Sequence, residues 1–583
     1  MTSNIPLRQY WDLLAEHIRP QRLHFTYLTV LLLGSIGLQI VNPQIMRTFI
    51  DAATSGAGSA VLVHSALLFI GLALVQQVVS VGARYYGEDV AWTATNALRS
   101  QLAAHCLNLD MSFHGDMSPG KLIERIDGDV SQLSTFFSQL MIRLIGNLLL
   151  LVGILVALYR EDWRVGLVFT VYAAVTLVAL NAVRSLAIPH EKARREADSV
   201  LFGFLEERLA GTEDIRSSGA VDFVLRGLYD LHHTILVHWR KTSFMYLIVG
   251  TTGNTLMLLA TVLALVGGFV LYRSGSITIG TVFLLMTYTN LLGRPIRELT
   301  QQAESLQNVG ASSQRLAELR AIKTKTVDGP GADIAPGPLP LRFEHVSFSY
   351  VEDEPVLEDV HFSLEPGRVL GLLGRTGSGK TTLARLIFRL YDVSAGEIAL
   401  GGVDVRQPTL RQLRERVALV TQDVQLFQAT VRDNLTFFDR SIPDARIMEV
   451  IETLGLSEWF ASLANGLDTE LESSGRGLSA GEGQLLAFTR VFLRDPGLVI
   501  LDEASSRLDP ATEQLIEMAV DRLLEGRTAI NIAHRLGTVH RADEIMILER
   551  GRTVEHGQRA ALAADESSRF YELLQTGLQE VLA

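Results

Sequence analysis

The chain has 583 residues, too many for one hydrophobic core, so several domains are expected. Its net charge of −12 disfavours nucleic acid as a partner, and its single cysteine, Cys106, excludes an internal disulfide. Its mean hydropathy of +0.23 and its 48% hydrophobic residues are high for a soluble enzyme. Because the long apolar runs lie before about residue 300, a membrane half followed by a soluble half is predicted.

Six apolar segments in the first half are long enough to cross a bilayer as helices. Before them, Tyr10, Trp11, Leu14 and Ile18 stand at helical spacing among charged residues, which predicts an amphipathic helix on the membrane surface. The first apolar segment starts too far into the chain, and lacks a small-residue cleavage site, to be a signal peptide. The predicted spans are residues 25–46, 61–83, 139–158, 165–183, 244–271 and 277–293.

Basic residues are distributed unevenly between the two ends of these spans, and this predicts the orientation. Only Arg47, Arg160, Arg164 and Arg273 fall in the loops opposite the N-terminus. Because loops rich in Lys and Arg stay inside, the N-terminus and the soluble half are predicted to be cytoplasmic, at a plasma or inner membrane. The basic residues on the N-terminal side are Arg8, Arg19, Arg22, Arg84, Arg99, Lys121, Arg125, Lys192, Arg194, Arg195, Arg208, Arg216, Arg226, Arg240 and Lys241.

Two long polar connections, residues 84–138 and 184–243, lie on the predicted cytoplasmic side and have a helical pattern. Each fits a pair of helices that continue the spans, since ~25 residues of helix reach roughly 37 Å. Polar residues inside the spans are more simply interhelical hydrogen-bonding groups than cargo contacts. Because Arg143 is the only formal charge within a span, amphipathic or lipid-like cargo is favoured over ions. The polar residues are Gln39, Asn42, Gln76, Gln77, Asn181, Asn254, Tyr288 and Asn290.

A stretch rich in Pro and Gly, residues 321–340, separates two predicted domains, residues 1–320 and 341–583. Alternating apolar residues from Leu341 to Tyr350 predict antiparallel strands. Val369–Leu373 is predicted to be a buried strand and Thr382–Arg389 a helix. Strand, glycine loop and helix in this order are typical of a phosphate-binding loop. The loop reads Gly374, Arg375, Thr376, Gly377, Ser378, Gly379, Lys380 and Thr381.

This loop predicts ATP and Mg²⁺ as cofactors. Its glycines let backbone N–H groups close around phosphate oxygens, at a helix start that favours anions. Lys380 supplies a cation to the β- and γ-phosphates, and the Thr381 hydroxyl is a ligand for Mg²⁺. The predicted nucleotide-binding set also includes Arg375, Thr376, Ser378 and Thr382.

The apolar run Leu498–Leu501 is followed by two acids, Asp502 and Glu503. Alone, such a pair at a strand end is often only a helix cap. After a phosphate loop, Asp502 is the expected partner of Mg²⁺, and Glu503 is the expected base that orients the attacking water.

The order of these motifs resembles the ATP-binding-cassette (ABC) transporters, and six spans ahead of the cassette resemble the exporter half-transporters. The resemblance implies an all-α membrane domain and an α/β P-loop ATPase domain with a RecA-like core, an antiparallel β subdomain and a helical subdomain. It implies that Tyr350 stacks on adenine, that Gln422 links the γ-phosphate and Mg²⁺ to the membrane domain, and that His534 contacts the γ-phosphate. It also implies coupling helices around Phe113–Arg125 and Phe204–Arg216.

The resemblance also implies a dimer, in which each ATP lies between the phosphate loop of one chain and the signature motif of the other. The loop Ser506–Asp509 is then expected to face the partner cassette. The usual signature is Leu-Ser-Gly-Gly-Gln, whereas residues 478–482 read Leu-Ser-Ala-Gly-Glu. Ser479 and Gly481, the implied contacts to the γ-phosphate, are kept.

The two changed signature residues predict a weak ATP clamp. Ala480 adds a Cβ where close approach of the backbone is needed. Glu482 adds a charge near a triphosphate, and at ~5 Å with an effective dielectric constant of ~20 the repulsion is on the order of 3 kcal/mol before screening. Glu482 also suits the first turn of its helix, where acids are favoured, and a stable helix start does not conflict with a weak ATP clamp.

A homodimer would repeat this fault at both ATP sites, whereas a heterodimer would contain it once. The sequence therefore favours a second, different half-transporter with an intact signature as the partner. The predicted function is ATP-driven export of an amphipathic drug, a lipid or a peptide-like substrate. An ATP-gated channel or regulatory membrane ATPase is the alternative, while the fused spans disfavour an importer and a soluble cassette ATPase.

Overall fold

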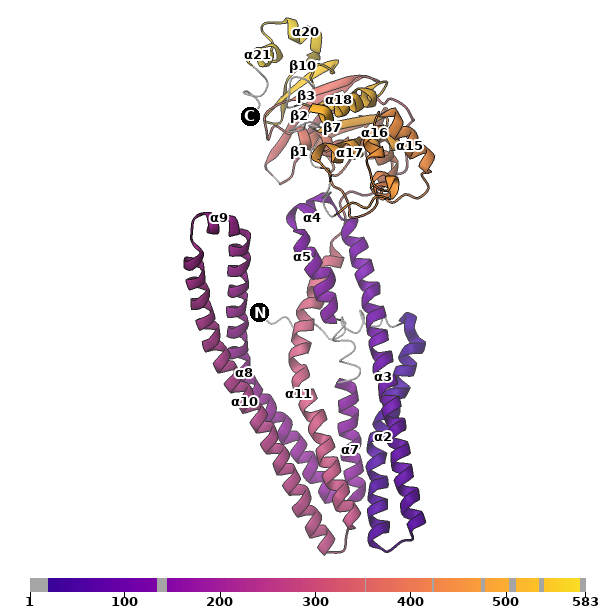
Figure 1. The fold of residues 1–583 in the computed structure, drawn as a ribbon, viewed down its shortest axis with the longest axis vertical. Coiled ribbons are helices and arrows are strands. Elements are labelled where there is room, and N and C mark those ends of the chain that lie inside the picture. The colour runs from indigo at the N-terminus through magenta and orange to yellow at the C-terminus, as the bar shows by residue number, and fades with distance from the viewer. Residues whose placement is uncertain are drawn as a thin grey trace. The chain divides into compact units, whose positions relative to one another are not determined.

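The structure is a computed structural model that describes residues 19–133, 144–351, 353–421, 424–472, 478–502, 510–533 and 539–576. The chain divides into two compact units, Met1–Leu107 with Pro119–Ile322, and Asn108–Ser118 with Lys323–Ala583. The first unit is helical in its described residues and the second is built on β-sheets (Figure 1), as the sequence predicts. Only Asn108–Ser118 departs from chain order, since it lies in the first half of the sequence and belongs to the second unit.

The helices of the first unit are long. α8 and α10 lie side by side with the short α9 between their tips, and α2 lies along α3 (Figure 1). α10 has 53 residues. A helix of that length reaches ~80 Å, well beyond the ~30 Å hydrocarbon core. The predicted continuation of the spans as helices is therefore confirmed for α3, α8 and α10, whereas residues 134–143, at the end of the first connection, lie outside the described residues. The elements are η1 (Arg19–Gln21), α2 (Arg22–Thr54), α3 (Ser59–Leu107), α5 (Pro119–Ile123), the π-helix η2 (Glu124–Asp129), α7 (Gly146–Glu161), α8 (Trp163–Ala210), α9 (Thr212–Ser217), α10 (Val221–Arg273) and α11 (Ile279–Ala321).

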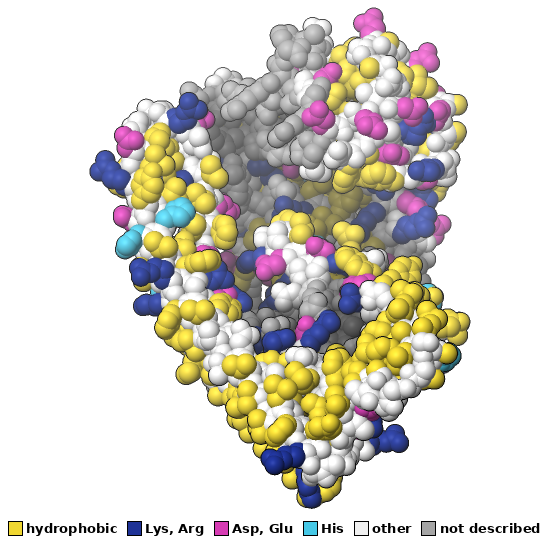
Figure 2. All heavy atoms as spheres, turned by 60° about the horizontal axis from the view of Figure 1, so that its bottom comes forward, with side chains coloured by type: hydrophobic (Ala, Val, Ile, Leu, Met, Phe, Trp, Pro, Cys, Tyr) yellow, Lys and Arg dark blue, Asp and Glu magenta, His cyan; other side chains and the backbone are white. Residues whose placement is uncertain are grey.

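Four helices among the described residues are long and apolar enough to cross a membrane: Arg19–Thr54, Ser59–Leu107, Trp163–Ala210 and Val221–Arg273. Their surfaces carry large exposed apolar side chains, as a bilayer-facing surface requires, and Figure 2 shows hydrophobic side chains over the helices. The other two predicted spans fall on α7, where residues 139–143 lie outside the described residues, and on the first part of α11. The count of six therefore stays a prediction.

The connections at one end of the first unit are short, as predicted. Ser55–Gly58 joins α2 to α3, Asp162 alone joins α7 to α8, and Ser274–Thr278 joins α10 to α11. Asp162 caps α8 by accepting a hydrogen bond from the backbone N–H of Arg164 at 2.8 Å.

Polar side chains bridge the helices near this end. Arg47, predicted to lie in a loop, lies within α2 and pairs with Glu161 at the end of α7, with an N–O distance of 2.6 Å. The Tyr288 hydroxyl of α11 donates to the carbonyl of Ile40 at 2.8 Å and accepts from Gln44 at 2.9 Å. The interhelical interpretation of Tyr288 is thus supported.

The second unit contains two sheets. The four-stranded sheet has the order β2-β1-β4-β5 and is antiparallel, which confirms the prediction for Leu341–Tyr350. The six-stranded sheet has the order β10-β9-β3-β8-β7-β6 and is parallel except for β10. The strands are β1 (Leu341–Ser349), β2 (Pro355–Leu364), β3 (Val369–Leu373), β4 (Ala395–Leu400), β5 (Val403–Asp404), β6 (Val417–Val420), β7 (Leu498–Asp502), β8 (Thr528–Ile532), β9 (Glu544–Glu549) and β10 (Arg552–Gln558).

Helices flank these sheets and complete the core of the second unit. Every residue of β3 is buried, and so are the first four residues of β7. The two predicted core strands are therefore confirmed. The helices are α4 (Met111–Asp116), α12 (Lys380–Ile387), α13 (Leu410–Arg416), α14 (Val431–Thr436), α15 (Asp444–Thr453), α16 (Ser457–Ala461), η4 (Gly466–Asp468), α17 (Ala480–Arg494), α18 (Pro510–Leu524), α20 (Arg559–Ala564) and α21 (Arg569–Thr576).

The Pro- and Gly-rich stretch before β1 has no helix or strand beyond Ala321, yet it is bound along the second unit. Ile334 and Leu339 are buried in the same apolar core as β1 and β3. The backbone N–H of Gly331 donates to the carbonyl of Gln407 at 3.0 Å. This stretch is therefore attached along its length.

Candidate functional site

The predicted phosphate loop lies at the carboxyl end of β3, between that strand and α12. Two of its glycines are required by space and conformation. A Cβ at Gly374 would stand 2.3 Å from the carbonyl oxygen of Leu548. Gly379 has a φ of +105°, and a Cβ there would stand 2.5 Å from the side chain of Leu357. The backbone can thus take the tight path around an anion that the sequence predicts.

Two polar side chains inside the loop fit an anionic ligand. Lys380 is only 6% exposed, and its Nζ donates to the carbonyls of Gly374 at 2.5 Å and Arg375 at 3.1 Å. The hydroxyl of Ser378 is buried without a hydrogen-bond partner among the described residues. A buried donor of this kind is costly unless a ligand satisfies it. The loop therefore fits a phosphate group, as the prediction of ATP requires.

The strand order brings Asp502 to the same sheet edge as the loop. β3, β8 and β7 are neighbours and parallel, so their carboxyl ends share one edge. Asp502 ends β7, beside Ile532 of β8, and Thr381 lies in the first turn of α12. A carboxylate and a hydroxyl are the oxygen ligands that Mg²⁺ accepts. The residues present thus fit the predicted metal.

Tyr350 follows β1 and reaches the helix after the loop. Its hydroxyl lies 3.1 Å from the Thr382 hydroxyl and accepts from Arg385 at 3.2 Å. Tyr350 is 42% exposed, and its ring meets Tyr391 edge-on, with centroids 5.1 Å apart. An exposed aromatic ring beside the loop fits the expected base-stacking role. Sequence reasoning did not identify Tyr391 or Arg385, because neither belongs to a motif.

The altered signature begins α17 through a reciprocal cap. The Ser479 hydroxyl accepts from the backbone N–H of Glu482 at 3.2 Å, and the Glu482 carboxylate accepts from the backbone N–H of Ser479 at 2.6 Å. The other carboxylate oxygen accepts from the indole N–H of Trp459 in α16 at 2.9 Å. Both oxygens of Glu482 are thus engaged at the helix start, close to Gly481. This supports the interpretation that Glu482 suits its helix.

α17 is tied to the segment after Gln422 by a buried arginine that sequence reasoning missed. The Arg490 guanidinium donates to the carbonyls of Asn434 at 2.7 Å and Gln425 at 3.0 Å, and lies over the ring of Phe437. Burial lowers the pKa of Arg490 to about 10, so the group is still charged at neutral pH. A lone Arg within a helix gives no sequence signal of such a role.

The structure describes thirteen of the predicted site residues and leaves three outside the described residues. Arg375, Thr376 and Gly377 form the exposed rim of the loop. Gln422, Glu503 and His534, and the loop Ser506–Asp509, lie outside the described residues. Of the implied coupling helices, Phe113–Arg125 begins within α4, in the second unit. Phe204–Arg216 covers the last turns of α8 and most of α9.

Comparisons with known proteins match both units. The family described as ABC transporter transmembrane region matches residues 25–296, and the family described as ABC transporter matches residues 357–506. The uncharacterized ABC transporter ATP-binding protein YknV of Bacillus subtilis is 30% identical over 570 residues, which are 95% of this chain and 92% of that protein. The ATP-dependent lipid A-core flippase of Pectobacterium atrosepticum is 28% identical over 529 residues, 89% of this chain and 90% of the flippase.

A solved structure of a bacterial Atm1-family ABC exporter with ATP bound has a similar fold. Its TM-score is 0.77, and the match covers 95% of this chain and 98% of that chain. At 23% sequence identity this likeness concerns the fold. Together the matches span both the helical unit and the unit that carries the phosphate loop.

Proposed function

Because this chain belongs to the ABC exporters with fused transmembrane and ATP-binding domains, we propose that it forms one half of a heterodimeric exporter. ATP hydrolysis coupled to transport follows from the family. The heterodimer rests on one observation, the carboxylate of Glu482 bound at the start of α17. The matching membrane domain makes it a multi-pass membrane protein. We further propose that the membrane domain, residues 1–320, has six spans. The cassette, residues 341–583, is then cytoplasmic.

We assign the roles in the intact ATP site as follows. Lys380 and the loop N–H groups hold the phosphates, and Tyr350 stacks on the base. Thr381 and Asp502 hold Mg²⁺, which neutralises charge that develops on the phosphates. Glu503 orients the attacking water. Gln422 and His534 complete the site at the metal and the γ-phosphate, as the resemblance implies.

The bonds of Glu482 support a weak second ATP site. A helix start binds anions through its free N–H groups and its dipole. Here a carboxylate already occupies the backbone N–H of Ser479 at 2.6 Å. A glutamine in its place would offer only one acceptor oxygen and no charge. That glutamine could accept the same N–H, so the difference is the charge. The signature of this chain therefore presents a negative charge to a triphosphate, so the partner should supply the intact signature.

The cargo class we propose is an amphipathic or lipid-like molecule. Helices α2, α3, α7, α8 and α10 expose many large apolar side chains, so a membrane-dissolved molecule can reach them. One similar protein is named a lipid A-core flippase, which supports a lipid-like cargo here. Drugs and peptide-like molecules of similar amphipathic character belong to the same proposed class.

Repair of the signature distinguishes the heterodimer from a homodimer. We propose that the partner's own catalytic glutamate or switch histidine is replaced, since the site it shares with Ser479–Glu482 is already impaired. In the heterodimer, Ala480→Gly with Glu482→Gln should then raise ATPase activity only modestly, because that replacement still limits the site. In a homodimer the repair restores both sites. Removal of a repulsion on the order of 3 kcal/mol then corresponds to a rise in ATPase activity of ~100-fold. The measurement is phosphate release by the chain purified alone and with its partner.

The unrepaired chain expressed alone is the control for this experiment. Vigorous turnover by that chain as a homodimer would refute the heterodimer, whatever the repair does. Trp459→Phe is a matched variant, since it removes one donor to Glu482 and leaves the charge. It should therefore not reproduce the effect of Glu482→Gln.

A topology experiment tests the proposed orientation. The predicted outer loop Tyr159–Arg164 is a tight turn that carries the cap of α8, so a tag there would disturb the fold. A tag between the exposed residues Gly275 and Ser276 is better placed. It should be labelled from outside intact cells, whereas a tag after Ala583 should be labelled only after permeabilisation. The reverse pattern would overturn the orientation.

A further inference from the structure

The chain passes between its two compact units three times, after Leu107, after Ser118 and after Ile322. The chain segments at the first and third of these points are hydrogen-bonded to each other, once in the first unit and again in the second. In the first unit the His105 ring at the end of α3 lies 3.1 Å from the carbonyl of Leu319, near the end of α11. In the second unit Asp110 binds the residues that follow the third passage. Two distant parts of the sequence are thus joined where each enters the cassette.

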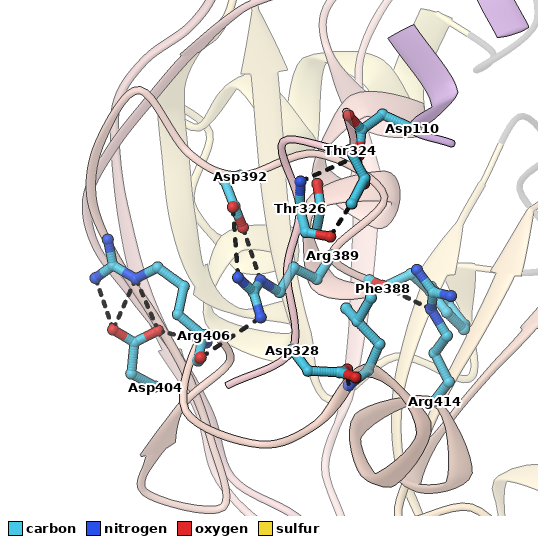
Figure 3. Close-up of polar contacts among 11 residues, drawn as sticks. Asp110, Thr324, Thr326, Asp328, Phe388, Arg389, Asp392, Asp404, Arg406 and Arg414 are labelled. Carbon is cyan, nitrogen blue, oxygen red and sulfur yellow. Dashed lines mark hydrogen bonds and ion pairs between the residues drawn. The ribbon is translucent and has the colours of Figure 1, made fainter. Parts of the chain in front are cut away.

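The Asp110 carboxylate makes the bonds in the second unit (Figure 3). It accepts from the Thr324 hydroxyl at 2.6 Å and from the backbone N–H groups of Lys325 and, at 3.1 Å, Thr326. Asp110 stands at the N-cap position of α4, yet its side chain does not cap that helix. Burial acts to raise the pKa of Asp110, but these hydrogen bonds lower it below its ordinary value. The carboxylate therefore stays ionised and accepts hydrogen bonds from residues 324–326.

The segment that Asp110 holds, residues 324–332, which we call the strap, is bound to the loop before α13. Asp328 accepts from the backbone N–H of Leu410 at 2.8 Å, and the N–H of Gly329 donates to the carbonyl of Pro408 at 3.1 Å. A Cβ at Gly329 would stand 2.3 Å from the carbonyl oxygen of Gln407. Only glycine fits there, so strap and loop are in close backbone contact.

The same loop is bound to the end of α12, the helix that starts at the phosphate loop. Arg389, buried after α12, pairs with Asp392 at 2.7 Å and donates to the carbonyl of Arg406 at 3.4 Å. Arg414 of α13 donates to the carbonyl of Phe388 at 3.5 Å. Figure 3 shows Arg389 directed toward Asp392 and the carbonyl of Arg406, and Arg414 directed toward the carbonyl of Phe388. Hydrogen bonds thus join each segment to the next, from the residues just after α12 to the loop before α13, from that loop to the strap, and from the strap to Asp110.

We propose that Asp110 is a positioning residue for ATP-driven movement, since it links the strap to the connection between α3 and α4. When α12 shifts with its nucleotide, the loop before α13 moves the strap, and Asp110 carries that movement to the ends of α3 and α11.

The test is hydrogen exchange on the full chain, purified in its native dimer in lipid nanodiscs, with and without ATP and vanadate. Asp110→Asn should speed exchange at Lys325 and Thr326 about tenfold, the value of one lost charge-assisted hydrogen bond. It should also remove the ATP-dependent change in exchange at residues 102–107 and 316–321. The KM for ATP should not change, because no residue of the phosphate loop is altered.

Asp116→Asn is the matched control, since it removes one negative charge from the exposed end of the same helix, α4. It should leave exchange at Lys325 and Thr326 unchanged. Asp110→Glu keeps the acceptor and should restore most of the ATP response. Thr324→Val removes one donor, keeps the carboxylate and should give a smaller effect, even if Asp110→Asn folds poorly. Unchanged exchange at Lys325, or an intact ATP response in Asp110→Asn, would overturn the proposal.

Discussion

Glu503→Gln should remove nearly all ATP turnover of the purified, partnered protein, by about 10²- to 10⁴-fold, the usual contribution of a general base. Asp502 ends β7 at the sheet edge where the phosphate loop begins, and Glu503 follows it directly in the sequence. The amide of glutamine keeps the size of the side chain and loses the carboxylate. ATP binding should persist, because Lys380, Thr381 and Asp502 are unchanged.

Phosphate release and retention of labelled ATP measure the two parts of this prediction separately. Glu525→Gln is the control, since it neutralises an exposed acid just after α18 in the same unit. It should leave turnover unchanged. Near-normal turnover in Glu503→Gln would show that another group activates the water.

Lys380→Ala should weaken ATP binding itself, by about 10- to 150-fold, if the ammonium makes one charge-assisted bond to phosphate worth ~1.5–3 kcal/mol. Its Nζ now lies on the carbonyls of Gly374 and Arg375, where an incoming phosphate oxygen can compete for it. Loss of the cation also leaves the loop N–H groups alone to balance the phosphate charge. A fluorescent ATP analogue measures the affinity without any need for turnover.

Two further variants test the interpretation of Lys380→Ala. Lys380→Met fills nearly the same buried volume without charge, so it should bind ATP as poorly as the alanine variant. Arg411→Ala removes one cation from an exposed position on α13 and should bind normally. Unchanged affinity in Lys380→Met would count against the phosphate-loop assignment.

Much of the fold was predictable because it depends on local features of the chain. Val369–Leu373 and Leu498–Leu501 are uninterrupted apolar runs, and both are buried strands. Gly374 and Gly379 mark a tight path after the first of them, and the structure explains both by close contacts. Long apolar helices in the first half follow equally from length and composition. The predicted bounds of one helix were wrong, since Thr382–Arg389 was expected and α12 is Lys380–Ile387.

The contacts that define the proposed roles join residues far apart in sequence. Trp459 reaches Glu482 across 23 positions, and Asp110 reaches Thr324 across 214. No periodicity or motif encodes such a pair, because each partner alone is an ordinary helix-start or loop residue. Arg490 likewise gains its role only from the carbonyls of Gln425 and Asn434.

The sequence by itself determined the class of the protein, an apolar helical half followed by an ATP-binding half, and named the phosphate loop and the altered signature. Those features depend on residue type and short-range spacing. Only the tertiary structure decided that both oxygens of Glu482 are bonded and that Asn108–Ser118 belongs with the cassette. It also showed that the Pro- and Gly-rich stretch is bound along its length. The physical reason is that hydrogen bonds and burial depend on which surfaces meet in the folded chain, and that is set by the whole fold.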